Sequence, residues 1–338
     1  MENHVSRWSN VQTVPESHVF PLEIRPGNEQ IPLCKTIPII DLENYEPNSE
    51  NLDSIHKIIK ASQEYGFFQV TNHGVSEDVI NEAVKVLEEL FNMPIDEISK
   101  EANENGFVYM GSTSFATKGA HLWRDNIKHP CHPLELSMQN WPQKPKRYRD
   151  VMEAYIVEIK RLSLRLLEMI SQGLGLEKGY LGGMSQVQFM TASNYPICPD
   201  PSLTLGLLKH FDHSLITILY QGNGKGLQVL KDGKWIGVEV VPNAFVVNIG
   251  TQVEIISNWK LTSAAHRVVT NKEEARTSIT TFINPNPDCV IEPAKLFVDD
   301  VTPPLYQPLS FKDFVNVSKP FGPFTDVVQN GVLPNINA

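Results

Sequence analysis

Lys209-His210-Phe211-Asp212-His213, which leads into the apolar run Leu215-Ile216-Thr217-Ile218-Leu219, is the stretch that decides the fold. The apolar run predicts a buried strand. Side chains two residues apart on an extended chain point the same way, so His210 and Asp212 can reach one ion. His266 begins another strand-like stretch and could complete the site from a neighbouring strand. Two imidazoles and one carboxylate on one face of a metal form the facial arrangement of non-haem Fe(II) sites.

A second motif follows His266 and predicts an anion site. Arg276 and Ser278 open a strand-like run that ends at Ile283, and they share one strand face. A guanidinium presents a fork of donors that matches a carboxylate, and the hydroxyl adds a further hydrogen bond. An unpaired charge is costly in an apolar strand. A bound anion would therefore supply the partner that Arg276 needs.

Tyr195 precedes a proline-fixed turn in Ser193-Asn194-Tyr195-Pro196-Ile197-Cys198-Pro199. In this order, the three motifs resemble those of the plant-type 2-oxoglutarate- and Fe(II)-dependent dioxygenases. Four further markers carry the resemblance over nearly the whole chain: Ile37–Leu42, Tyr65–Gly74, Pro303–Tyr306 and Phe311–Phe314. Within the family, Cys131–Leu134 and Trp141–Pro145 are most similar to the hyoscyamine 6-dioxygenase branch. Family members often carry Asn where this chain has Ser193, so Ser193 is assigned to the cosubstrate only weakly.

The resemblance implies an α+β fold with a mainly β core: a double-stranded β-helix, or jelly roll, with supporting N-terminal and central helices. We expect one domain over residues 1–338. It would comprise an N-terminal helical and substrate-loop region, residues 1–135, and a long helix with the jelly-roll catalytic core, residues 136–338.

The resemblance also implies a reaction. Fe(II) would bind His210, Asp212 and His266, and the distal carboxylate of the cosubstrate 2-oxoglutarate would meet Arg276, Ser278 and Tyr195. Dioxygen would oxidatively decarboxylate the cosubstrate to succinate and CO2, and a C–H bond of a small plant metabolite would be hydroxylated. Desaturation, ring closure or dealkylation would begin from the same hydrogen abstraction. Ascorbate is expected as the reductant.

Composition excludes several classes of function. The chain of 338 residues is 41% apolar and 20% charged, which is ordinary for a globular protein. Its formal net charge of -10 weighs against nucleic acid as a partner. It contains no run of 18 apolar residues and does not begin like a secretory signal. We therefore expect a cytoplasmic protein without membrane or nucleic-acid partners. The resemblance implies that it acts on a small molecule and O2, and we expect a monomer.

Periodicity predicts the main elements. Helical spacing indicates helices near residues 51–66 and 76–92, the second capped by Ser76, and a long helix from Tyr148 to Gln172. Short strands are expected over residues 67–72 and from about 186 to 300. Lys231-Asp232-Gly233-Lys234 predicts a two-residue hairpin. Residues 100–135 carry no clear period and are expected to be irregular.

We expect that irregular segment to line the substrate pocket together with strand residues that face the iron. The candidates are Phe107, Tyr109, Met110, Trp123 and Phe282, with the C-terminal segment around Phe321 and Phe324 closing as a lid. The stretch from Gly106 to Trp123 contains Lys118 and His121 but no Asp or Glu. A neutral or weakly acidic substrate, such as a phenylpropanoid, terpenoid or flavonoid, therefore fits it at least as well as a cation. His213 would point away from Asp212 and is expected to be structural or at the surface.

Three alternatives remain open. A related oxidase could use ascorbate instead of 2-oxoglutarate, although Tyr195, Arg276 and Ser278 weigh against it. A catalytically silent jelly roll that binds a small molecule would not need all three metal ligands. A metal-dependent isomerase on a similar barrel would not need the Arg-x-Ser pair.

Overall fold

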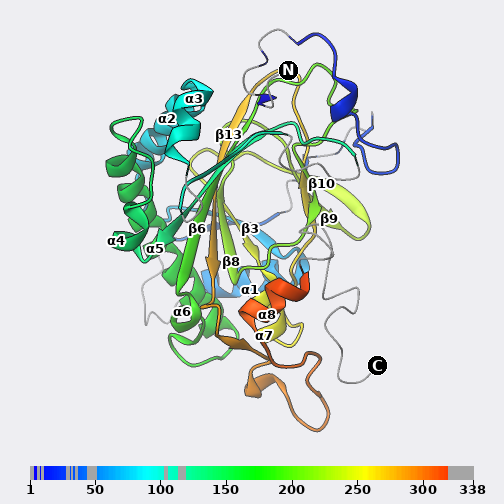
Figure 1. Cartoon of the computed structure of the whole chain (residues 1–338). Helices are drawn as coiled ribbons and strands as arrows, with labels where there is room; N and C mark the ends of the chain where they lie inside the picture. The colour runs from blue at the N-terminus through cyan, green and yellow to red at the C-terminus, as the bar shows by residue number, and fades with distance from the viewer. Residues whose placement is uncertain are drawn as a thin grey trace.

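Two β-sheets face each other across the interior of the chain in the computed structural model (Figure 1), which describes residues 4–5, 8, 11–27, 31, 33–34, 37–43, 52–102, 106–112 and 119–318. The large sheet has the strand order β2-β3-β11-β8-β13-β6-β5-β4, and the small sheet has the order β1-β10-β9-β12-β7. A two-stranded sheet, β14-β15, lies apart from them. From β6 to β13 the chain repeatedly changes between the two main sheets, which is the path of the expected double-stranded β-helix. The α+β fold class with a jelly-roll core is confirmed.

The bounds of the elements follow the chain order. The large sheet is built from β2 (Ile39–Asp41), β3 (Phe67–Thr71), β4 (Val108–Met110), β5 (Asp125–His132), β6 (Val187–Tyr195), β8 (Ile216–Tyr220), β11 (Phe245–Ile249) and β13 (Arg276–Asn284). The small sheet is built from β1 (Leu33–Cys34), β7 (Leu207–His210), β9 (Leu227–Lys231), β10 (Lys234–Val238) and β12 (His266–Val268). The separate pair is β14 (Val290–Ile291) and β15 (Leu309–Ser310).

Helices cover the outer face of the large sheet (Figure 1). They are α1 (Asp53–Glu64), α2 (Glu77–Asn92), α3 (Ile95–Glu101), α4 (Leu134–Met138), α5 (Tyr148–Gly173) and α6 (Tyr180–Met184). Beyond β11 come α7 (Thr251–Ile256) and α8 (Phe311–Ser318), and short 3-10 turns occupy Glu16–His18 and Lys295–Phe297. The Ser76 side chain accepts a hydrogen bond from the Val79 amide at 3.2 Å, so the predicted helix cap is confirmed.

The main core lies between the helices and the outer face of the large sheet. The apolar faces of α1, α2 and α5 pack there against strand side chains that point outward from the large sheet. Ile218 and Ile279 are two of these side chains, and both are fully buried. The outer face of the large sheet packs in this core. The inner face of the large sheet, which points toward the small sheet, carries polar and aromatic residues. The turn between β9 and β10 has positive φ at Asp232 and Gly233, as a type I′ hairpin requires.

One prediction about the fold was wrong. Residues 100–135 are not irregular throughout, because they contribute β4 and β5 to the large sheet. Most of β5 is polar and it contains Pro130, yet it pairs antiparallel with β6 from Asp125↔Asn194 to His132↔Gln188. Pairing with a neighbouring strand overrides the weak local signal of this sequence. The correction matters for function, because β5 forms one wall of the interior.

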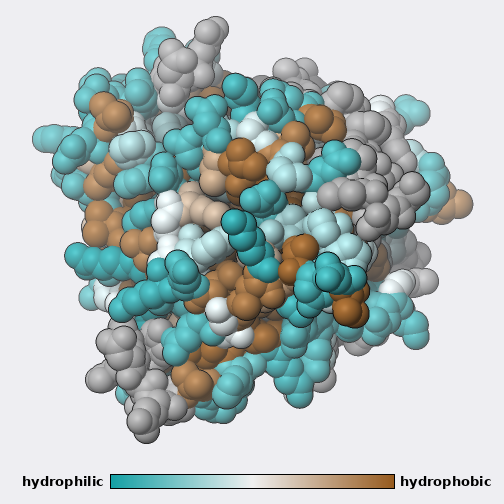
Figure 2. Space-filling view, turned by 90° about the horizontal axis from the view of Figure 1, so that it is seen from below, coloured by the Kyte–Doolittle hydropathy of each residue, from teal (hydrophilic) through white to brown (hydrophobic). Residues whose placement is uncertain are grey.

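The end of the molecule at which α6, α7 and α8 lie carries apolar patches separated by hydrophilic side chains (Figure 2). Exposed apolar residues beyond β13 include Val290, Leu296 and Val301. Within the described residues, no helix combines the length and hydropathy that a membrane span requires.

Candidate metal centre and adjoining cavity

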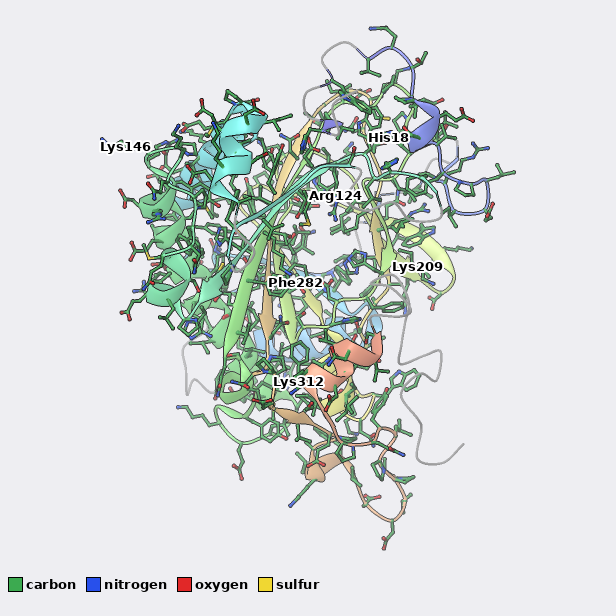
Figure 3. The ribbon with its side chains drawn as sticks, in the orientation of Figure 1. His18, Arg124, Lys146, Lys209, Phe282 and Lys312 are labelled. Carbon is green, nitrogen blue, oxygen red and sulfur yellow. The ribbon has the colours of Figure 1, made fainter. Side chains whose placement is uncertain are left out.

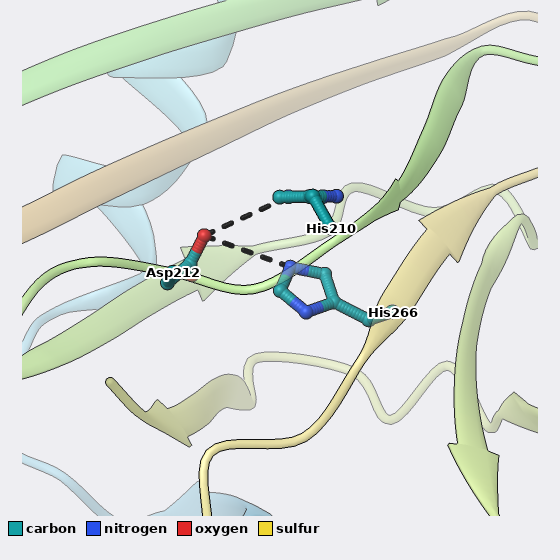
Figure 4. Close-up of side chains that lie close together, drawn as sticks. All are labelled: His210, Asp212 and His266. Carbon is teal, nitrogen blue, oxygen red and sulfur yellow. Dashed lines mark ion pairs between the residues drawn. The ribbon is translucent and has the colours of Figure 1, made fainter. Parts of the chain in front are cut away.

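His210, Asp212 and His266 meet on the small sheet (Figure 4). His210 ends β7, His266 begins β12, and the two residues are direct partners in the antiparallel pairing of these strands. One carboxylate oxygen of Asp212 lies 3.6 Å from His210 Nε2 and 3.7 Å from His266 Nε2. The three ligand atoms lie within 4.8 Å of one another, which is close enough for one ion to contact all of them. In the described part of the chain, this is the one such cluster of His, Cys, Asp and Glu.

Hydrogen bonds outside the cluster orient each ligand atom. His210 Nδ1 lies 2.9 Å from the Leu208 carbonyl oxygen and His266 Nδ1 lies 3.1 Å from that of Ala264. With these nitrogens donating, both Nε2 lone pairs face the cluster. Asn248 Nδ2 donates to Asp212 Oδ2 at 2.7 Å, and Oδ1 stays directed at the imidazoles. The site therefore has ligands whose directions are fixed before any ion binds.

The electrostatics of the cluster favour the protonation states that a cation needs. Burial and the positive charge of a protonated His266 lower the pKa of His210 to about 3. Burial raises the pKa of Asp212, but the neighbouring His266 and His210 and hydrogen bonds from Thr217 and Asn248 outweigh that effect and lower it overall. A neutral imidazole and an ionised carboxylate are thus present together at neutral pH, as metal coordination requires.

Arg276, Ser278 and Tyr195 come together on the large sheet. Arg276 begins β13 opposite Tyr195 at the end of β6, and Ser278 lies opposite Ser193. The Arg276 side chain is 4% exposed, its Nε donates to the Gln221 carbonyl oxygen at 2.6 Å, and its guanidinium lies 5.2 Å from the Tyr195 ring centre. Its buried Nη1 has no hydrogen-bond partner among the described residues. A buried cation with an unused donor suits a bound carboxylate.

Both clusters open into one cavity of about 600 Å³ between the sheets. The metal-ligand triad lines one part of its wall, and Arg276, Ser278 and Tyr195 line another. This size is typical of small-molecule sites. Figure 3 shows Arg124 and Phe282, which also line the cavity, between the two sheets. A molecule held by Arg276 can therefore share the cavity with an ion held by the triad.

Of the residues predicted to contact substrate, Met110 and Phe282 line the cavity. Phe107, Tyr109 and Trp123 do not, which corrects the expectation. Phe107 is fully buried in the main core, and Tyr109 stacks on His4 because it alternates with Met110 along β4. The Trp123 indole donates to the Pro196 carbonyl oxygen at 3.1 Å and packs in a separate cluster with Val5 and Cys198. Phe321 and Phe324 lie outside the described residues.

The structure adds wall residues that the sequence did not indicate. Arg124, Asn126 and Lys128 reach the cavity from β5 and the residue before it, and Phe189 and Thr191 reach it from β6. Residues 124, 126 and 128 share one strand face, but Asp125 and His129 beside them are also polar, so no alternation in the sequence marks this wall. Ser193 accepts hydrogen bonds there from Asn126 at 2.8 Å and Arg124 at 3.4 Å.

His213 also lines the cavity, with its ring edge-on to Phe314 at 5.0 Å, so the prediction that it points away from the side of Asp212 was wrong, while its structural role stays a prediction. The extended geometry on which that expectation rested does not hold, because β7 has already ended at His210. Residues 211–213 instead form a loop whose side chains need not alternate.

Comparisons with known proteins agree with this geometry. Residues 184–285 match the model of the 2OG-Fe(II) oxygenase superfamily, and residues 37–149 match that of the N-terminal region of non-haem dioxygenases in morphine synthesis. Hyoscyamine 6-dioxygenase of Hyoscyamus niger is 39% identical over 333 residues, 94% of each chain. The 2'-deoxymugineic-acid 2'-dioxygenase of Hordeum vulgare is 36% identical, over 94% of this chain and 93% of its own. A crystal structure of JOX2 in complex with 2OG, Fe and JA superimposes with a TM-score of 0.83, at 32% identity, over 98% of this chain and 97% of its own.

Proposed function

The chain belongs to the 2OG-Fe(II) oxygenase superfamily, whose members use Fe(II) and 2-oxoglutarate, and we propose that it hydroxylates a C–H bond of a small plant metabolite. The reaction would consume O2 and 2-oxoglutarate and release succinate and CO2. One observation carries the proposal: the triad and the buried Nη1 of Arg276, which has no described partner, line the same cavity.

We propose that His210, Asp212 and His266 hold Fe(II). The donor set suits this ion, because imidazole and carboxylate ligands on one face leave positions open for other molecules. Bound Fe(II), with 2-oxoglutarate and dioxygen, supplies the oxidising power that no amino-acid side chain offers. Asn248 contributes by holding the Asp212 carboxylate in place through its 2.7 Å hydrogen bond.

Arg276, Ser278 and Tyr195 are proposed to bind the distal carboxylate of 2-oxoglutarate. Arg276 would donate from Nη1, and the two hydroxyls line the same wall. The guanidinium is already fixed by its bond to the Gln221 carbonyl oxygen, so little side-chain entropy is lost when the anion binds. The cosubstrate also removes the cost of burying an unmatched charge.

The substrate would occupy the remainder of the cavity, against Met110, Phe189 and Phe282. Phe189 and Phe282 are cross-strand partners whose rings stack at 4.7 Å, and they offer a flat apolar surface. Such a surface orients an apolar scaffold and excludes water from the region that faces the triad. The pose of the scaffold would decide among hydroxylation, desaturation, ring closure and dealkylation.

Two of the three alternatives from the sequence make different demands on Arg276 and on the triad. An ascorbate-dependent oxidase without 2-oxoglutarate would leave a buried cation beside the triad without an anion. A non-catalytic binder would have no use for three oriented ligand atoms. The burial of Arg276 and the hydrogen bonds around the triad therefore favour the 2-oxoglutarate-dependent enzyme, with ascorbate serving as a reductant of the iron.

The test is succinate formation from 2-oxoglutarate with Fe(II), with and without a pool of plant metabolites, followed by mass spectrometry for substrates that gain one oxygen. Succinate should form only with Fe(II), and the Asp212→Ala variant should form none. A chain that binds Fe(II) but never converts 2-oxoglutarate, even with ascorbate present, would refute the proposed function.

A further inference from the structure

Lys128 lies on the cavity wall without an acidic partner. It projects inward from the middle of β5, where its cross-strand partner is Thr191 of β6, and Thr191 pairs in turn with Thr280 of β13. In the described part of the chain, no carboxylate lies within ion-pair distance of its amine. The Lys128 amine instead lies 4.3 Å from the centre of the Phe189 ring. A cation is thus held against an aromatic face inside the cavity.

The Lys128 side chain is exposed and lines the cavity, and partial desolvation by the surrounding protein lowers the pKa of its amine. On the outer face of a protein, a lysine side chain can extend its amine into water, which solvates the charge. A lysine therefore does not need a cavity position for its charge to be solvated. Its neighbours along β5, Ile127 and His129, are fully buried on the opposite face. Strand alternation therefore directs Lys128 to the cavity face of β5, where a molecule bound in the cavity can pair with it.

The charge balance of the cavity gives the sign of that molecule. Among the described residues that line it, the cations are Arg124, Lys128 and Arg276, and Asp212 is the one carboxylate. Fe(II) and doubly ionised 2-oxoglutarate cancel each other, and Asp212 offsets Arg276. The charge of Lys128 then has no compensating carboxylate on the described cavity wall, so a bound anion is favoured there and a bound ammonium is disfavoured.

We propose that Lys128 binds the carboxylate of the substrate, and that this substrate is a monocarboxylic acid with an apolar or aromatic body. The inference rests on the proposed function and names its substrate class. Lys128 stands at the end of a cross-strand row with Thr191 and Thr280, and its one ammonium matches a single negative charge. The stacked Phe189 and Phe282 rings form the neighbouring row, two residues further along the strands, and receive the apolar body.

The experiment compares the affinity of carboxylic acids with that of their uncharged methyl esters. Cinnamic, 4-phenylbutanoic, indole-3-acetic and jasmonic acids are each titrated beside their methyl esters, by calorimetry, into protein loaded with Mn(II) and 2-oxoglutarate without oxygen. At least one acid should bind about 10- to 100-fold more tightly than its ester, the range of one charge-assisted hydrogen bond. No preference for the acid in any of the four pairs overturns the inference.

Three variants separate a binding role from a structural one. Lys128→Met should remove the preference for the acid while leaving the dissociation constants of the ester and of 2-oxoglutarate unchanged, and Lys128→Arg should restore part of it. Lys178→Met removes the same charge from an exposed turn before α6 and should behave like wild type. An acid preference that survives in Lys128→Met assigns the anion to another group and overturns the proposal.

Succinate formation is scored separately, so the two hypotheses fail differently. A chain that prefers acids through Lys128 but makes no succinate with Fe(II) is a binding protein, and only the proposed function is lost. A chain that makes succinate as readily with esters as with acids keeps its function and loses the inference.

Discussion

Replacing Arg276 with methionine should abolish the response of the protein to 2-oxoglutarate and leave its own stability nearly unchanged. The substitution removes a hydrogen bond from a charged donor to Gln221, worth roughly 1.5–3 kcal/mol. It also removes a buried Nη1 without a described partner, whose cost is roughly 1–3 kcal/mol. The two terms largely cancel, so the free energy of unfolding without 2-oxoglutarate should change by about 1 kcal/mol or less.

The effect on the cosubstrate should be much larger. Truncating one partner of a buried charge pair costs about 2–5 kcal/mol, which corresponds to roughly a 30-fold to several-thousand-fold weaker Kd. At a concentration 100 times the wild-type Kd, 2-oxoglutarate stabilises the wild type by about 2.7 kcal/mol. With an unfolding entropy of about 2.1 cal/mol/K per residue over 338 residues, that raises Tm by about 4 °C. Arg276→Met should show little of this shift.

Thermal unfolding of the Mn(II)-loaded protein, with and without 2-oxoglutarate, measures both quantities. Arg267→Met is the matched control, because Arg267 is equally buried but hydrogen-bonds Gln228 at 2.8 Å and stacks on Trp235. It should lower Tm and keep the full shift with 2-oxoglutarate. An unchanged shift in Arg276→Met would refute the assignment of this residue and point to the ascorbate-dependent alternative.

Three further predictions follow from the same cavity. Alanine at His210, Asp212 or His266 should eliminate stoichiometric Fe(II) binding and turnover, and calorimetric titration with Fe(II) under nitrogen checks each variant; normal affinity would remove that residue from the site. Asn248→Ala should weaken metal affinity about 10- to 100-fold, because it loosens the Asp212 carboxylate, and a wild-type Fe(II) titration curve would refute that. Hyoscyamine and other cationic amines should be poor substrates, since Asp212 is committed to the metal and Lys128 repels them; a kcat/KM for hyoscyamine well above that of neutral or acidic scaffolds would contradict this.

The candidate metal ligands could be proposed from the sequence because strongly apolar strands lie close to them: β8 follows Asp212, and His210 and His266 stand at the ends of two other strands. Alternation along an extended strand accounts for Arg276 and Ser278 in β13 but not for Asp212, which lies in a loop, so the approach of Asp212 to His210 depends on the loop as folded. The rest of the fold was predicted from the family resemblance and not from local patterns. Strand order in a jelly roll depends on pairings between residues far apart in the chain, which local patterns do not show.

The substrate wall could not be located in the same way. In β5 the buried face includes Asp125, Ile127 and His129, and the cavity face includes Asn126 and Lys128, so neither face is uniformly apolar. Residues 125–132 form a strand because they pair with β6, and not because of their own sequence pattern. Aromatic residues in the preceding segment were a poor guide, because Trp123 and Phe107 anchor the chain instead of facing the cavity.

The register of β5 on β6 has an evolutionary consequence. One inserted or deleted residue before Asp125 could shift the pairing by one position, which would turn Asn126 and Lys128 outward and bring their neighbours into the cavity. The proposed iron and 2-oxoglutarate residues lie on other strands and would keep their places. Enzymes that descend from one ancestor could thus replace the side chains of the proposed acid-binding wall in a single insertion or deletion. The residues proposed to bind iron and 2-oxoglutarate would be inherited unchanged.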